Sequence, residues 1–212
     1  MKVHVRMGDE HKILYALSFL VLGLVTFWYF AVYERPITNA QDFSYNDEAP
    51  VVVAFGDSLI EGVGAKTTGG FVGVLEQDLG IDIINHGVSG DTTSDAWKRI
   101  RATTKIEPDV VLISLGGNDF IQRKNRDQTE AELERIVSEI HRSGAAVILL
   151  EVPGYYGMHR SVSRTFQTAY VSNILSGLLG KEEYMFDAIH PNDTGYKKVA
   201  EKIKPTLSRL ID

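Results

Sequence analysis

Residues 51–59 read VVVAFGDSL, five apolar residues that stop at a glycine, an aspartate and a serine. A short, continuous apolar run that is rich in β-branched residues and ends at a turn residue predicts a strand buried on both faces. Three similar runs follow, at residues 81–85, 110–115 and 146–151. Helical spacing of apolar residues separates them, at residues 70–79, 92–103 and 129–143, and Pro191 opens a last pattern that ends near residue 211. This alternation predicts an α/β domain with a central parallel sheet, helices on both faces and right-handed crossovers.

Polar residues follow three of these predicted strands at the point where each strand ends. The first strand leads into Gly56-Asp57-Ser58-Leu59, the second into HGVSGD at residues 86–91, and the third into Gly116-Gly117-Asn118-Asp119. Ligands of an open parallel sheet bind at the carboxyl ends of its strands. The sequence therefore predicts that a hydroxyl, a glycine-rich turn and a carboxamide meet at one edge of the sheet.

A fourth polar segment, DAIHP at residues 187–191, precedes the last predicted helix. A histidine three residues after an aspartate can fold back, so that the carboxylate of Asp187 accepts a hydrogen bond from one ring nitrogen of His190. The other ring nitrogen is then free to take a proton from a serine. Pro191 suits the first turn of the final helix and would hold His190 at its start.

These four segments, in this order, resemble the SGNH (GDSL-type) hydrolase family over residues 51–198. Residues 56–59 match its nucleophile block, Gly90 its glycine block, residues 116–119 its asparagine block, and residues 187–190 its terminal acid–histidine block. The resemblance implies a three-layer, flavodoxin-like fold. It also implies ester hydrolysis through an acyl-enzyme.

Within this resemblance, Ser58 is the expected nucleophile, His190 the general base, and Asp187 the group that fixes the His190 tautomer. The expected oxyanion donors are the backbone N–H groups of Ser58 and Gly90 and the side-chain amide of Asn118. A glycine at position 90 is expected because only a hydrogen atom allows so close an approach to the oxyanion.

Other polar residues near these segments are expected to be structural. Asp57 is expected to brace the turn beside the nucleophile and to stay outside the catalytic set. His86 is expected to be a packing residue, and His141 and His159 to lie at the surface. No two histidines have a metal-ligand spacing with carboxylates, so we expect no metal and no cofactor. No Gly-x-Ser-x-Gly elbow surrounds Ser58, which argues against the common α/β-hydrolase fold.

Candidate substrate-binding residues follow the fourth predicted strand, in the segment PGYYGM. Its position resembles that of the family's mobile loop beside the acyl-binding groove, which makes Tyr155 and Tyr156 candidates. Leu175, in the apolar segment 174–179, could extend an apolar surface toward the site, and ordinary core packing explains it equally well. The stretch between Met158 and Tyr170 is short, so we expect an abbreviated helix and fifth strand there.

The amino-terminal segment has a different character, because residues 13–33 contain no charge. Twenty-one helical residues at about 1.5 Å each span roughly 30 Å, the thickness of the bilayer hydrocarbon core. A buried core helix would rarely be apolar all round at this length, and a cleavable signal peptide normally has a shorter apolar region. An uncleaved membrane anchor is therefore preferred over both alternatives.

The flanks of this anchor predict its orientation and the division of the chain. Lys2, Arg6 and Lys12 precede it and Arg35 follows, so the positive-inside tendency places the N-terminus in the cytoplasm. The predicted order is a cytoplasmic tail (1–12), a single membrane helix (13–33), a tether (34–49) and an extracytoplasmic catalytic domain (50–212), either periplasmic or on the cell surface.

The overall composition excludes several classes of protein. The chain of 212 residues is 44% hydrophobic and contains no cysteine, which removes thiol nucleophiles, zinc fingers and disulfide-stapled folds. A formal net charge of −6 gives no reason to expect binding to nucleic acid.

The sequence therefore predicts a membrane-tethered serine esterase that acts on small-molecule or lipid esters of the lysophospholipid, aryl ester or thioester type. A carbohydrate O-deacetylase of the same fold and a non-catalytic surface binding module are the alternatives. The oligomeric state stays open.

Overall fold

The structure, a computed structural model, describes residues 49–211. Five parallel strands form one sheet in the order β2-β1-β3-β4-β5. Their bounds are β1 Val52–Gly56, β2 Ile83–Gly87, β3 Val110–Ser114, β4 Ala146–Leu150 and β5 Ala169–Val171. This order has the switch point between β1 and β3 that is typical of flavodoxin-like folds. The predicted fold class, a central parallel sheet with helices on both faces, is confirmed.

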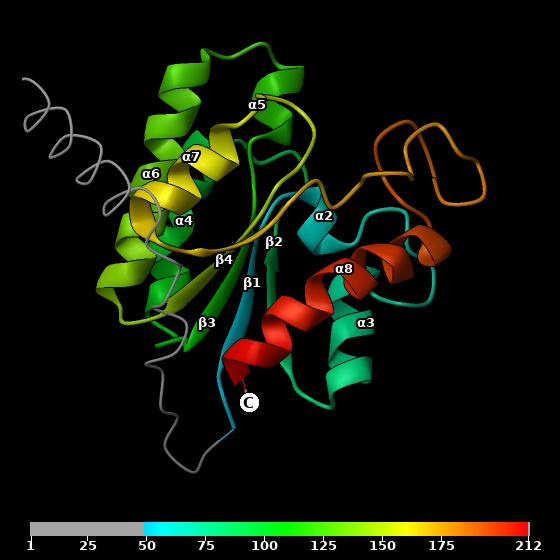
Figure 1. Ribbon diagram of the computed structural model, residues 1–212, viewed down its shortest axis with the longest axis horizontal. Helices are drawn as coiled ribbons and strands as arrows, with labels where there is room; N and C mark the ends of the chain where they lie inside the picture. The colour runs from blue at the N-terminus through cyan, green and yellow to red at the C-terminus, as the bar shows by residue number, and fades with distance from the viewer. Residues whose placement is uncertain (1–48, 212) are drawn as a thin grey trace, which may run out of the picture. The chain divides into compact units, whose positions relative to one another are not determined.

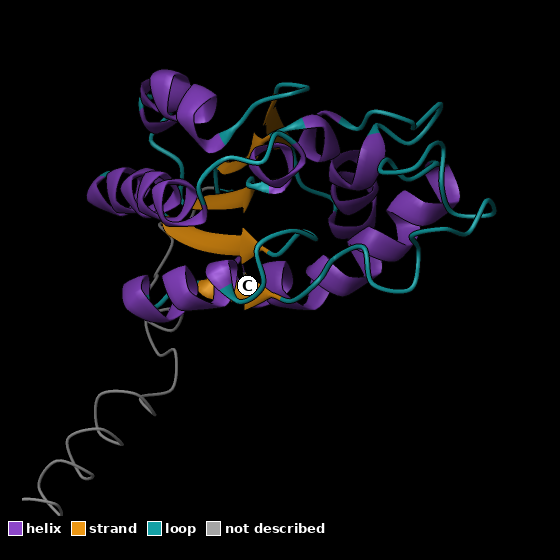
Figure 2. Cartoon of the chain, turned by 90° about the horizontal axis from the view of Figure 1, so that it is seen from above, coloured by secondary structure: helices purple, strands orange, loops and turns teal. Residues whose placement is uncertain are grey.

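Two layers of helices cover the sheet (Figures 1 and 2). One face carries α3 (Gly70–Leu79) and α8 (Asp193–Ile211), and the opposite face carries α4 (Thr93–Thr104), α6 (Arg126–Arg142) and α7 (Met158–Phe166). Two short helices, α2 (Ser58–Glu61) and α5 (Gly117–Ile121), lie directly after β1 and close after β3. Both short helices therefore begin at the carboxyl edge of the sheet.

Strand β1 shows why the sheet must be covered on both sides. All five of its residues are buried. Val52 and Ala54 pack toward α3 and α8, whereas Val53 and Phe55 pack toward α4 and α6. This alternation follows from the two-residue period of a strand, and it explains why the apolar run in the sequence is continuous.

The start of the last helix differs from the prediction. Residue Pro191 pairs with Met185 in an isolated bridge, and α8 begins two residues later, at Asp193. The side chain of Asn192 accepts a hydrogen bond from the N–H of Gly195 at 3.0 Å, so Asn192 caps the helix. An asparagine at this position satisfies a free helical N–H, which a proline cannot do.

The predicted tail, the membrane helix at residues 13–33 and all but the last residue of the tether lie outside the described residues. Within residues 49–211, no helix has the length and apolar character needed to cross a bilayer.

Candidate active site

The serine of the GDSL segment occupies the first position of α2. The carboxylate of Asp57 caps this helix by accepting a hydrogen bond from the N–H of Leu59 at 3.0 Å. As the first helical residue, Ser58 has a backbone N–H without an intrahelical acceptor. Gly56, the last residue of β1, lies so close to β3 that a Cβ there would be 2.1 Å from the carbonyl oxygen of Ser114, so only glycine fits at this position. The local sequence thus presents both the hydroxyl and the N–H of Ser58 at the edge of the sheet.

The loop before α8 brings an aspartate and a histidine to this serine. His190 Nδ1 lies 2.8 Å from Asp187 Oδ2, and His190 Nε2 lies 2.9 Å from Ser58 Oγ. Asp187 Oδ1 also accepts hydrogen bonds from the backbone N–H groups of Ile189 and His190, each at 2.8 Å. With the carboxylate accepting from Nδ1–H, the tautomer assigned by this network leaves Nε2 to accept the Ser58 proton. The structure therefore brings together the three residues of the predicted triad.

The carboxylate of Asp187 is ionised at neutral pH. Partial burial raises its pKa, but hydrogen bonds from His190 and Ile189 outweigh burial and lower the pKa to about 2. A permanently charged carboxylate at this position stabilises the protonated imidazole that a general base becomes.

Gly90 and Asn118, the other predicted oxyanion donors, are linked through Asp91. The Asn118 Nδ2 group donates a hydrogen bond to the backbone carbonyl of Asp91 at 2.9 Å, which leaves its second N–H for another acceptor. Gly90 has a φ of +86°, and a Cβ there would meet no atom within 4 Å. The left-handed backbone is therefore the reason for glycine at this position. No neighbouring protein atom among the described residues would clash with a Cβ there.

Arg99 of α4 holds the same loop and was not identified from the sequence. Its guanidinium donates to Asp91 Oδ2 at 2.6 Å, to the His86 carbonyl at 2.9 Å and to the Gly56 carbonyl at 2.7 Å. It also stacks on the Phe55 ring at 4.4 Å. One side chain thus ties the ends of β1 and β2 to the loop that carries Gly90.

Asp57 lies under the nucleophile and is buried. Desolvation by burial raises its pKa to about 7, although the N–H of Leu59 and the charge of His190 oppose this effect. Its carboxylate caps α2, as its predicted bracing role requires, and it does not hydrogen-bond to the imidazole of His190.

Two other polar groups support the ends of the strands. Asp119 is buried and accepts hydrogen bonds from the N–H and the hydroxyl of Thr93, at 3.0 and 2.8 Å, so it fixes the start of α4. His159 is also buried, with Nε2 2.8 Å from the Leu115 carbonyl, so its predicted surface position is wrong. The reason is that α7 begins at Met158 and packs against the turn at Gly116.

A cavity of about 200 Å³ opens beside Ser58 and His190. Most of the residues that line it are apolar: Leu59, Phe120, Ile121, Val152, Pro153, Leu175, Leu179, Ala188 and Ile189. Among the three predicted substrate-binding residues, Leu175 lines this cavity. The Tyr155 ring packs edge-on against Phe120, and its hydroxyl donates to backbone carbonyls of Asp119 and Lys124. The Tyr156 side chain is 99% exposed and does not line the cavity.

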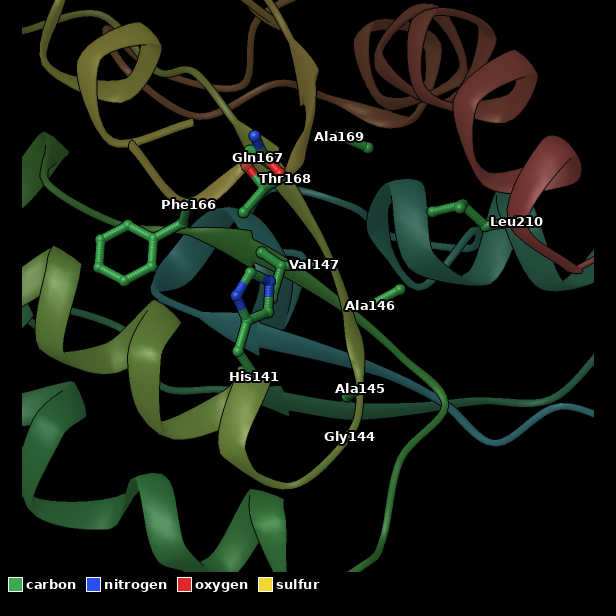
Figure 3. A pocket seen from close by; sticks show the side chains of 10 residues that line it. All are labelled: His141, Gly144, Ala145, Ala146, Val147, Phe166, Gln167, Thr168, Ala169 and Leu210. Atoms are coloured by element: carbon green, nitrogen blue, oxygen red, sulfur yellow. The ribbon is translucent and has the colours of Figure 1, made fainter. Parts of the chain in front are cut away.

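A second cavity, of about 190 Å³, lies near the amino ends of β4 and β5 (Figure 3). It is lined by residues that include His141, Phe166 and Thr168. Ser58 follows the carboxyl end of β1, so this cavity lies at the opposite edge of the parallel sheet and takes no part in the chemistry at Ser58. Within residues 49–211, no cluster of three or more histidine, aspartate or glutamate side chains could hold a metal ion.

Comparisons with known proteins agree with this geometry. The model of the GDSL-like Lipase/Acylhydrolase family matches residues 54–198. The esterase TesA of Pseudomonas aeruginosa is 30% identical over 181 residues, which cover 77% of this chain and 90% of TesA. The thioesterase 1/protease 1/lysophospholipase L1 of Escherichia coli K12 is 25% identical over 179 residues, which cover 77% of this chain and 86% of that protein.

A crystal structure of TesA matches with a TM-score of 0.67 at 29% identity, and the match covers 76% of this chain and 99% of that one. The family match spans the strand ends that carry Ser58, Gly90 and Asn118 as well as the loop that carries Asp187 and His190. The chain belongs to the GDSL-like lipase/acylhydrolase family and is a serine hydrolase that acts on ester bonds.

Proposed function

We propose that this protein hydrolyses acyl esters of the lysophospholipid, aryl ester or thioester type, with Ser58 as the nucleophile of an acyl-enzyme. The observation that carries the proposal is the apolar cavity that opens onto the Ser58–His190 hydrogen bond. An acyl chain fills such a cavity without leaving polar groups unpaired, whereas a sugar would leave many.

In this mechanism, Ser58 Oγ attacks the acyl carbonyl while His190 Nε2 takes the hydroxyl proton. Asp187 stabilises the imidazolium that forms. The backbone N–H groups of Ser58 and Gly90 and the free N–H of Asn118 stabilise the oxyanion, and one such donor contributes about 3–4 kcal/mol. His190 then protonates the leaving group and activates a water molecule, which hydrolyses the acyl-enzyme.

The roles assigned to the triad are tested by labelling with a fluorophosphonate. The full chain should form a covalent adduct at Ser58, and Ser58→Ala should abolish it. Ser89→Ala is the matched control, because Ser89 also follows a strand at this edge and donates its backbone N–H to Glu61. Equal labelling of the Ser58→Ala variant and the native chain would refute the assignment.

The substrate class is tested by comparing a chain-length series of p-nitrophenyl esters and lysophospholipids with an acetylated glycan. The apolar cavity predicts that kcat/KM rises as the acyl chain extends beyond acetate. Preference for the acetylated glycan, without response to longer chains, would favour the carbohydrate O-deacetylase. Absence of hydrolysis of every ester would favour a binding module.

We further propose that residues 13–33 anchor the chain in a membrane, with the N-terminus in the cytoplasm and the catalytic domain outside. The proposal is supported by the length of this uncharged segment and by the cations that precede it. A wash of membranes at high pH should leave the full chain in the pellet, and its release into the supernatant would contradict the anchor.

A further inference from the structure

Four apolar side chains surround the mouth of the active-site cavity and remain largely open to solvent. Phe120 and Ile121, on α5, are 50% and 56% exposed, and Leu179 and Ile189, in the segment between β5 and α8, are 44% and 43% exposed. We call these four residues the collar. Figure 1 shows α5 and the orange segment beyond the ends of the strands. The collar therefore combines two segments that are distant in the sequence.

The collar gathers exposed apolar side chains around one opening of the domain surface. Their exposed area faces both the open cavity and the water around its mouth. Apolar side chains that gather on a surface in this way indicate contact with a partner or a lipid. Their position around the mouth restricts what can cover them.

We propose that the collar docks on the surface of a lipid bilayer and opens the cavity toward acyl esters held there, an inference that rests on the proposed esterase function and tether. A folded protein or a second copy of this chain seated on the collar would close the mouth. A fluid lipid surface covers the same side chains and delivers an acyl chain to Ser58 without passage through water.

The charges next to α5 favour this occupant. Arg123 follows Ile121 after one residue and its side chain is exposed, whereas the ammonium group of the next residue, Lys124, donates a hydrogen bond to Thr92 Oγ1 at 2.9 Å. Apolar side chains next to cations suit the boundary between the acyl chains and anionic headgroups. Lys181, Glu182 and Glu183 follow Leu179 closely in the sequence and carry a net negative charge, so we expect α5 to approach the lipid more closely than the segment around Leu179.

The length of the predicted tether permits this contact. Residues 34–48 span at most roughly 50 Å when extended. A compact domain of about 160 residues is roughly 40 Å across. The described chain enters β1 at the edge of the sheet opposite Ser58, so the tether must run past the domain for the collar to reach the same bilayer. The extended tether is therefore only slightly longer than the domain that it has to pass.

Single-cysteine labelling tests the docking directly, because the chain has no cysteine of its own. The full chain is reconstituted in vesicles of phosphatidylcholine and phosphatidylglycerol, with an environment-sensitive fluorophore attached at Ile121→Cys. The matched control is Lys105→Cys, an exposed position that precedes β3 at the other edge of the sheet. Nitroxide-labelled lipid should quench the label at position 121 at least threefold more than the label at position 105.

Flotation of the vesicles separates the failures. A chain that floats with the vesicles but shows equal quenching at the two positions overturns the docking and leaves the anchor standing. A chain that does not float and is not quenched overturns both the anchor and the docking. Hydrolysis of a water-soluble ester by the unlabelled native chain in the same vesicles reports on the proposed esterase independently.

A shortened tether provides a second test that leaves the site intact. Deletion of residues 38–45 leaves seven tether residues, which span roughly 25 Å and cannot pass a domain of about 40 Å. Hydrolysis of a long-chain ester embedded in the vesicles should fall at least tenfold, while hydrolysis of a water-soluble short ester stays unchanged. Equal hydrolysis of the embedded ester by both chains would overturn the inference.

Discussion

Arg99→Lys tests whether the loop that carries Gly90 is positioned by a single side chain. The guanidinium makes three hydrogen bonds, to Asp91, His86 and Gly56, and its side chain is 25% exposed. A lysine retains the charge and can still reach Asp91, but its ammonium cannot span both carbonyls as a planar fork does. A hydrogen bond to a charged group contributes about 1.5–3 kcal/mol, so loss of one such bond should lower the free energy of unfolding by about 2 kcal/mol.

The effect on catalysis separates a positioning role from a purely structural one. A Gly90 N–H displaced from the oxyanion should lower kcat for p-nitrophenyl butyrate by about 10–100-fold, equivalent to about 1.4–2.7 kcal/mol. The KM should change little, because Arg99 does not line the cavity. Urea unfolding measures the stability, and Arg101→Lys, at an exposed position on the same helix, is the matched control.

Chemical rescue strengthens this test. Arg99→Ala leaves the carboxylate of Asp91, which is 12% exposed, without its cation, and added guanidinium ion should restore part of the lost kcat. The positioning role is refuted if Arg99→Lys is destabilised but retains kcat within twofold of the native value under conditions where it is fully folded.

Three further substitutions test other parts of the site. Burial raises the pKa of Asp57 from 3.8 to about 7, so between these values the folded state binds a proton that the unfolded state has released. Its contribution to stability therefore falls as the pH rises from about 4 to about 7, and Asp57→Asn, which still caps Leu59, should flatten this fall in urea unfolding at pH 5 and pH 8. Tyr196→Phe removes the donor to the Val63 carbonyl, at 2.7 Å, and should lower the free energy of unfolding by about 1 kcal/mol, measured in the same way. Gly90→Ala strains a φ of +86°, at a cost of about 1–2 kcal/mol, and should lower kcat about tenfold by shifting the backbone N–H; an unchanged kcat would show that catalysis does not require glycine at this position.

The three central strands, β1, β3 and β4, could be predicted from the sequence because they are buried on both faces and are therefore continuously apolar. The edge strand β2 is partly exposed and gives a weaker signal, whereas the long helices between the strands show a 3.6-residue period. The short helices α2 and α5 could not be predicted in this way, because four or five residues are too few to show a period. The Asp57 cap and the close approach of Gly56 to the end of β3 position α2, and the second of these contacts depends on the neighbouring strand.

The candidate triad could be predicted because Asp187 and His190 are close in sequence and Ser58 follows a strand end. Arg99 could not, since two of its three partners are backbone carbonyls, which every residue carries and no motif marks. The collar was identified only in part: Leu179 lies in the apolar segment 174–179, for which the sequence allowed an apolar surface toward the site, whereas Phe120 and Ile121 are ordinary apolar residues that only the fold brings to the same cavity. Exposure distinguishes such residues from the core, and exposure is a property of the folded chain. For this reason the chemistry at Ser58 could be inferred from the sequence alone, whereas the route by which an acyl ester reaches Ser58 had to be inferred from the structure.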